Sequence, residues 1–165
     1  MDEQFIFRKQ FRQILAIIIG VGIIGSLGAI FLSEPGTSRI WANILLNNQF
    51  FLGIALGGAF FLAVHRIAWS GWHTVLQRIP EAMASFIPVA FVLMLLIYFG
   101  MDKIYHWSNY DGHDAILEGK KGWLNIPFFF IRLVLYFAGW IFLTQMMRKN
   151  SDLLMNSGDL KYHNR

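Results

Sequence analysis

The sequence predicts an all-α integral membrane protein, built as one bundle of four transmembrane helices. Composition gives the first reason: 56% of the 165 residues are hydrophobic and 15% are charged, whereas soluble domains carry about 25% charged residues. The second reason is that the apolar residues form four long blocks. A helical block of about 20 residues crosses the roughly 30 Å hydrocarbon core of a bilayer.

Each block is bounded by polar or turn-forming sequence. The first follows the basic stretch 8–12 and ends at a turn sequence, 33–36, so it resembles an uncleaved signal-anchor rather than a shorter signal peptide. The third begins near Pro80, which suits a first helical position. The fourth stops directly before Arg148. The predicted spans are residues 14–32, 44–69, 80–100 and 126–147.

The basic residues predict the orientation of the bundle, because Lys and Arg bias short loops towards the cytoplasm. With the N-terminus inside, the inner segments hold Arg8, Lys9, Arg12, Arg66, Arg78, Arg148, Lys149, Lys161 and Arg165, and the outer segments hold Arg39, Lys103, Lys120 and Lys121. We therefore predict an N-in/C-in topology with a basic cytoplasmic N-terminus (1–13), a periplasmic loop (101–125) and a cytoplasmic polar tail (148–165). Because the basic residues flank the spans, nucleic-acid binding is not expected.

Small residues recur at helical spacing on two spans. Small residues four positions apart let helix backbones approach closely, which matters because lipid supplies no hydrophobic drive between helices. We predict that these faces pack against protein; the alternative is that glycine is simply common in transmembrane helices. The pairs are Gly22 with Ser26, Gly25 with Ala29, and Gly53 with Gly57.

Asparagine side chains near the ends of two spans are candidates for interhelical hydrogen bonds. Asn43 and Asn47 are four residues apart, so they share one face of the second span. Asn125 directly precedes the fourth span and is a candidate of the same kind. We predict that these amides bond to other helices; capping and headgroup contact at the outer interface is the alternative interpretation.

Ionisable residues in or near the spans are the candidates for a proton path. Arg132 lies within the fourth span, where an arginine usually faces protein, water or a partner, although its long stem also lets it reach headgroups. Its candidate partners are Asp102 and carboxylates of other subunits. Glu81 and His65 on the inner side, with His106 on the outer side, are the predicted relay groups. For Glu81, stabilisation of a helix N-terminus is the alternative.

The sequence predicts no metal or redox cofactor in this chain. It has no cysteine, which excludes thiolate-bound clusters and the cysteine motif for c-type haem. No histidine pair lies near the centres of facing helices, so membrane-embedded haem is not expected. His106, His113 and Asp114 fit no metal-ligand spacing, which also argues against a membrane enzyme that cleaves lipids or peptide bonds.

Three stretches resemble a known family. The run from His113 to Arg132, which ends in Leu-Asn-Ile-Pro-Phe-Phe-Phe-Ile-Arg, resembles the loop-and-helix signature of a large membrane subunit of alternative complex III. Residues 41–57 and the stretch Pro80-Glu81-Ala-Met-Ala fit the same subunit, often labelled quinone-binding subunit 2 and similar to the polysulfide-reductase membrane subunit. The resemblance covers about residues 39–148.

The resemblance implies a bacterial inner-membrane complex that oxidises quinol and reduces cytochrome c. Such a complex contains c-type haems and iron–sulfur clusters, none of them bound by this chain. Implied partners are a homologous polysulfide-reductase-like quinol subunit, an iron–sulfur subunit, multi-haem c-type cytochromes and lipids. The chain would scaffold the complex, with a proton half-channel as a further hypothesis.

The family's subunit is considerably longer and has further spans in a second bundle. The resemblance therefore matches this chain to the N-terminal four-helix portion, and a fragment and a split subunit both fit its length. From the residues alone, the alternative function is a stand-alone membrane transporter or channel component.

Overall fold

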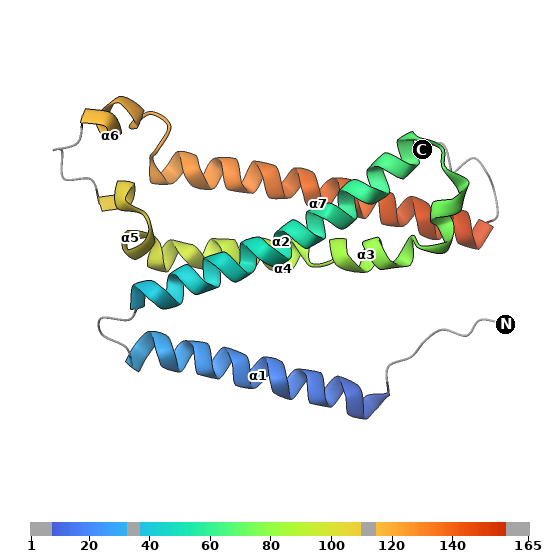
Figure 1. Ribbon diagram of the computed structural model, residues 1–165, viewed down its shortest axis with the longest axis horizontal. Helices are drawn as coiled ribbons and strands as arrows, with labels where there is room; N and C mark the ends of the chain where they lie inside the picture. Colours follow the sequence, from blue (N-terminus) through green and yellow to red (C-terminus); the bar gives the residue numbers. More distant parts are fainter. Residues whose placement is uncertain (1–7, 33–36, 110–114, 158–165) are drawn as a thin grey trace.

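The computed structural model describes residues 8–32, 37–109 and 115–157, and its regular secondary structure there is helical throughout (Figure 1). Four stretches are long and apolar enough to cross a membrane: Lys9–Ala29, Ser38–Ile67, Arg78–Ile104 and Ile126–Ser151. The prediction of an all-α, four-span membrane fold is confirmed, while the N-in/C-in orientation stays a prediction. The candidate residues His113 and Asp114 lie outside the described residues.

The helices follow the predicted order. They are α1 (Lys9–Leu32), α2 (Thr37–Ile67), α3 (Arg78–Ala84), α4 (Ile87–Leu96), α5 (Met101–Ile104), α6 (Ala115–Lys120) and α7 (Ile126–Ser157). Short 3₁₀ segments lie at Gly71–Val75, Ile97–Gly100 and His106–Asn109. We call the end of the bundle that carries α5 and α6 the loop end, and the end where α2 stops and α3 starts the α3 end (Figure 1).

Two long helices extend beyond their predicted spans. α2 begins at Thr37 rather than near residue 44, and α7 continues past residue 147 to Ser157. Both extensions are more polar than the spans they continue, and neither contains proline or glycine. Nothing in them therefore interrupts a helix that is already nucleated. Hydropathy therefore marks the apolar part of each helix and not its ends.

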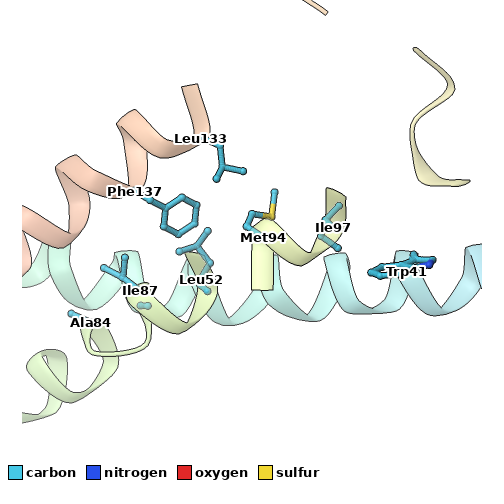
Figure 2. Packing of buried hydrophobic residues seen from close by; sticks show 10 residues of the cluster. Trp41, Leu52, Ala84, Ile87, Met94, Ile97, Leu133 and Phe137 are labelled. Carbon is cyan, nitrogen blue, oxygen red and sulfur yellow. The ribbon is translucent and has the colours of Figure 1, made fainter. Parts of the chain in front are cut away.

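The hydrophobic core lies between α2, the third span and α7 (Figure 2). Its buried members are Trp41, Leu52, Ala55, Ala84, Ile87, Ala90, Met94, Ile97, Leu133 and Phe137. The Phe91 and Phe137 rings, 5.1 Å apart, add an aromatic contact between α4 and α7. These three spans form the packed unit of the protein, and their outward faces carry many exposed apolar side chains.

α1 stands apart from this unit, and no part of its apolar span is buried (Figure 1). A side chain added at Gly22 or Gly25 would meet no atom of another element within 4 Å. The Ser26 hydroxyl donates to the Gly22 carbonyl oxygen of its own helix, at 2.8 Å. The predicted close packing through the small residues of α1 is therefore not made within the described part of the chain.

The sequence predicts the third span as one stretch, residues 80–100. In the structure it is not one continuous helix but breaks between α3 and α4. Pro88 follows the break by two residues; it has no N–H to donate to the Ala84 carbonyl, and its ring crowds that oxygen. The chain responds with a tight turn in which the Ser85 hydroxyl donates to the Ala82 carbonyl oxygen at 2.6 Å and the Phe86 N–H donates to Met83. The two halves still follow one another along α2 (Figure 1).

Two glycines allow α2 to approach the third span closely. A side chain at Gly58 would lie 2.8 Å from the Pro80 carbonyl oxygen and 2.9 Å from the Met83 Cβ. A side chain at Gly100 would overlap the Trp41 ring. A side chain added at Gly53 or Gly57, the two glycines that the spacing pattern selected, would meet no atom within 4 Å. Within this chain, the close approach of α2 is therefore made at Gly58, and packing of Gly53 and Gly57 against a partner chain stays a prediction.

Gly58→Leu is expected to lower the stability of the bundle by about 1–3 kcal/mol, because the new side chain overpacks a tight helix contact. Gly57→Leu is the matched control, since the neighbouring position is open. The measurement is thermal unfolding in mild detergent, followed by circular dichroism. Equal melting temperatures for the two variants would contradict this assignment of the interface.

Candidate functional site

A cavity of about 380 Å³ lies at the loop end, between α2, α4 and α7. Aromatic rings from the loop and from α7 form most of its wall, among them Trp107, Trp123 and Trp140. Four polar side chains interrupt this apolar lining: Gln49, Tyr105, Arg132 and Tyr136. An apolar cavity of this size with a few convergent polar groups is the usual form of a small-molecule site, for which typical volumes are about 300–1,000 Å³.

Arg132 borders this cavity and is held by the start of its own helix. Its Nε donates to the Phe128 carbonyl oxygen at 3.3 Å, and its Nη2 donates to the Trp123 carbonyl oxygen at 3.0 Å. The guanidinium carbon also lies over the Trp123 ring, 4.1 Å from its centroid, and 4.7 Å from that of Phe128. Cation–π contact and two carbonyl acceptors stabilise a cation near the membrane boundary. The side chain thus bends back towards the loop end.

The predicted partnership of Arg132 with Asp102 is not formed in the described part of the chain. Asp102 is exposed, and the hydrogen bond at this residue runs from Asn109 Nδ2 to its backbone oxygen, at 3.5 Å. His106 is also exposed, in the 3₁₀ segment that follows α5. The structure therefore brings neither residue into contact with the guanidinium.

Asn125, predicted as an interhelical residue, caps α7 instead. Its Oδ1 accepts the backbone N–H of Phe128 at 2.8 Å, and its Nδ2 donates to the Gly122 carbonyl oxygen at 3.0 Å. The bond to Oδ1 satisfies the Phe128 N–H, which has no partner inside the helix. The second ties the helix start to the preceding turn. Asn125 is therefore a positioning residue, because it sets where α7 begins and so where Arg132 lies.

Tyr105 and Gln49 were not singled out from the sequence, yet both line the cavity. The Tyr105 ring packs 5.5 Å from that of Trp107 and 6.0 Å from that of Phe129. Burial raises the pKa of the Tyr105 phenol, so the hydroxyl stays neutral and keeps its proton for donation at physiological pH. The aromatic cluster near the predicted membrane boundary was the available signal in the sequence.

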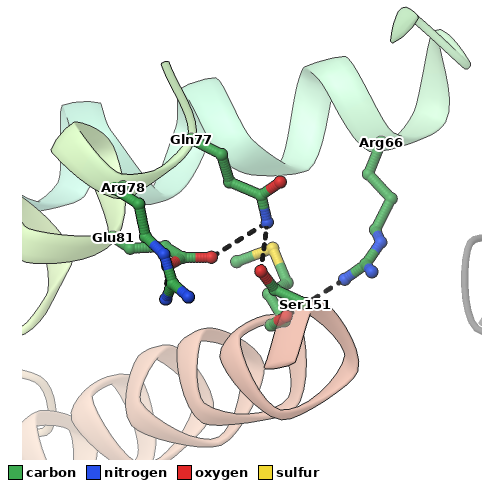
Figure 3. Close-up of polar contacts among 6 residues, drawn as sticks. Arg66, Gln77, Arg78, Glu81 and Ser151 are labelled. Atoms are coloured by element: carbon green, nitrogen blue, oxygen red, sulfur yellow. Dashed lines mark hydrogen bonds and ion pairs between the residues drawn. The ribbon is translucent and has the colours of Figure 1, made fainter. Parts of the chain in front are cut away.

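A second polar cluster surrounds Glu81 at the α3 end (Figure 3). Glu81 is 5% exposed. One carboxylate oxygen accepts from Gln77 Nε2 at 2.9 Å, and the other accepts from Arg78 Nη1 at 3.2 Å. The same Gln77 nitrogen donates to the Ser151 hydroxyl of α7 at 2.6 Å. The cluster offsets the cost of burying a carboxylate and links α3 to α7.

His65 is not brought to Glu81. The hydrogen bonds of Glu81 run to other residues, whereas His65 Nδ1 lies 2.9 Å from the Phe61 carbonyl oxygen. The imidazole also packs between two rings, 3.9 Å from the Phe61 centroid and 4.8 Å from that of Trp72. The predicted inner pair of relay groups therefore falls into two separate environments.

Among the asparagines of α2, Asn48 rather than Asn43 or Asn47 hydrogen-bonds to another span. Its Nδ2 donates to the Ala90 carbonyl oxygen of α4 at 3.1 Å, and its Oδ1 has no partner in the described structure. Asn47 donates to the Asn43 carbonyl oxygen of its own helix at 2.8 Å. Within this chain, the bond between spans therefore comes from the neighbouring residue of the same polar stretch and not from Asn43 or Asn47.

The described residues contain no group of three or more His, Cys, Asp or Glu side chains placed to hold a metal ion. The fold and these sites define a multi-pass helical membrane protein with an aromatic cavity at one end and a buried carboxylate cluster at the other. No protein-family model and no curated protein matches the sequence.

Asn125→Ala is expected to destabilise the start of α7 by about 1 kcal/mol, because the Phe128 N–H loses its acceptor. Asn125→Asp keeps an acceptor oxygen and serves as the control. The readout is hydrogen exchange of the backbone amides of Ile126, Phe128 and Phe129, with the melting temperature alongside. Unchanged exchange in the alanine variant would show that this cap does not hold the helix start.

Proposed function

We propose that this chain is a membrane subunit of a bacterial inner-membrane quinol:cytochrome c oxidoreductase complex, and that its loop-end cavity contributes to quinol binding. The cavity is the observation that carries the proposal. A quinol has a flat ring that stacks on aromatic side chains and two oxygen atoms that hydrogen-bond. The cavity offers aromatic walls together with Arg132, Tyr105 and Gln49, which are donors of the kind such oxygens need. The family resemblance of the sequence supports the same function.

A groove between α1 and the packed unit supports the proposal of a larger assembly. It has a volume of about 700 Å³ and is lined by Gly22, Gly25 and Ser26 on α1 and by Asn47 and Asn48 on α2. Small residues on one wall and amides on the other suit a transmembrane helix of another subunit, which would approach closely and hydrogen-bond. On this proposal, the iron–sulfur clusters and haems belong to the other subunits of the complex.

A proton half-channel remains part of the proposal, with Glu81 as its inner group. Glu81 is buried beside Gln77, which also contacts the hydroxyl of Ser151. Between this cluster and the loop end, the buried polar residues of the described chain are Asn48 and Thr144. A proton path would therefore need water or a neighbouring subunit to connect them.

The test of the complex is affinity purification in mild detergent with a tag on this chain. We expect c-type haem absorbance in the eluate and quinol-dependent reduction of cytochrome c. A colourless, inactive chain recovered alone would overturn the oxidoreductase proposal. Transport by that chain in liposomes would then support the alternative of a stand-alone transporter or channel component.

Within the active complex, Arg132→Gln and Tyr105→Phe are each expected to raise the KM for quinol about tenfold, because each removes a hydrogen bond worth about 1–1.5 kcal/mol. Arg39→Gln is the matched control: it removes an exposed charge at the same end, outside the cavity. An unchanged KM in both cavity variants would contradict quinol binding here, even in a complex that assembles normally.

A further inference from the structure

A second cavity lies at the α3 end, between the last turns of α2 and the second half of α7. It has a volume of about 590 Å³. Its α2 wall runs from Leu56 to Ile67, and its α7 wall runs from Trp140 to Met147. Eleven residues of helix rise correspond to about 16 Å, so the cavity is a slot that follows the helix axes. A slot along a membrane helix matches an acyl chain better than a compact ligand.

The slot is apolar along its length and ends at a cation. Leu56, Ala59, Phe60 and Leu143 are among its walls, and Arg66 lines it at the α2 terminus. A lipid has the same distribution of chemistry, with an apolar chain and a polar headgroup at one end. A cation at this end favours a headgroup of net negative charge over a zwitterionic one, whose own cationic group is repelled by Arg66.

The Arg66 guanidinium has N–H donors left to bind such a headgroup. Its Nη1 donates to the Met147 carbonyl oxygen at 3.3 Å (Figure 3). Glu81 attracts it electrostatically, but both oxygens of that carboxylate are bonded to Gln77 and Arg78. Among the residues whose side chains the structure describes, no carboxylate lies within ion-pair distance of Arg66. A guanidinium carries five N–H donors, and a phosphate accepts from two of them in parallel.

Trp69 marks the mouth of the slot at the level of a membrane interface. It is 64% exposed and has a positive φ of 52°, a backbone conformation that non-glycine residues adopt rarely and that commonly ends a helix. The Ser70 N–H closes this helix end by donating to the His65 carbonyl oxygen at 3.2 Å. The indole is one wall of the slot, and tryptophan favours the headgroup region of a bilayer.

From these features we infer that the slot between α2 and α7 binds an anionic phospholipid, with one acyl chain between the helices, its phosphate on Arg66 and its glycerol region beside Trp69. Arg148 and Lys149, which follow the last wall residue of α7, add positive charge outside the slot. Trp140 lines both this slot and the loop-end cavity, while the other lining residues of the two differ. Lipid binding in the slot does not depend on quinol chemistry.

The first experiment measures lipid binding to the delipidated full chain in mild detergent by native mass spectrometry, with phosphatidylglycerol and phosphatidylcholine as probes. We expect one phosphatidylglycerol to bind more tightly than phosphatidylcholine. Arg66→Gln should weaken phosphatidylglycerol binding about tenfold, because a charged hydrogen-bonded contact is lost. Lys149→Gln, which removes the same charge on the same side but outside the slot, should change it less than about twofold.

Two further variants keep this test independent of folding. Arg66→Lys retains the charge and should retain the preference for phosphatidylglycerol. Phosphatidylglycerol with brominated acyl chains should quench the fluorescence of Trp140, and Trp140→Phe should remove that component. Equal weakening in Arg66→Gln and Lys149→Gln would overturn the proposal in favour of diffuse surface attraction. Equal binding of the two lipids, or no quenching assigned to Trp140, would overturn it as well.

Discussion

The close approach of α2 to the third span is the constraint on which the rest of the structure depends. Lipid tails are as apolar as the helix faces, so helices associate in a membrane through van der Waals fit and hydrogen bonds rather than through the hydrophobic effect. At the α3 end this fit requires a glycine, Gly58, under Pro80, and at the loop end Trp41 packs on Gly100. Midway, Asn48 bonds to the Ala90 carbonyl oxygen. Contacts at three levels thus fix the register of the two spans.

That register decides what gathers at each end of the bundle. At the loop end, Gln49 and Leu52 of α2 line an apolar cavity with hydrogen-bonding groups, together with the aromatic loop and the first half of α7. At the α3 end, the break before Pro88 separates α3 from α4, so the short α3 carries Glu81 into contact with α7 through Gln77 and Ser151. The slot that ends at Arg66 opens beside this contact.

Polar residues in the membrane region of this protein satisfy their hydrogen bonds mainly with nearby backbone. Arg132 and Asn125 both bond to carbonyl oxygens of the turn before α7 or its first turn, and Asn47 bonds within α2. In lipid an unsatisfied polar group is costly, and local partners are available whatever the helix packs against. An intramembrane polar residue is therefore weak evidence of function by itself. Its placement on a cavity wall is stronger evidence, as it is for Arg132.

Sequence alone determined the four spans, the start of α7 and the position of Arg132 within the fourth span, because hydropathy and length act through neighbours in the chain. It also located the polar stretch of α2 and the glycines of that helix. Only the tertiary structure decided that Gly58 rather than Gly57 meets the neighbouring span and that Asn48 rather than Asn47 bonds across it. Helical periodicity states which residues share a face, but in lipid nearly every face is apolar. The face that meets another helix is therefore chosen by fit between surfaces.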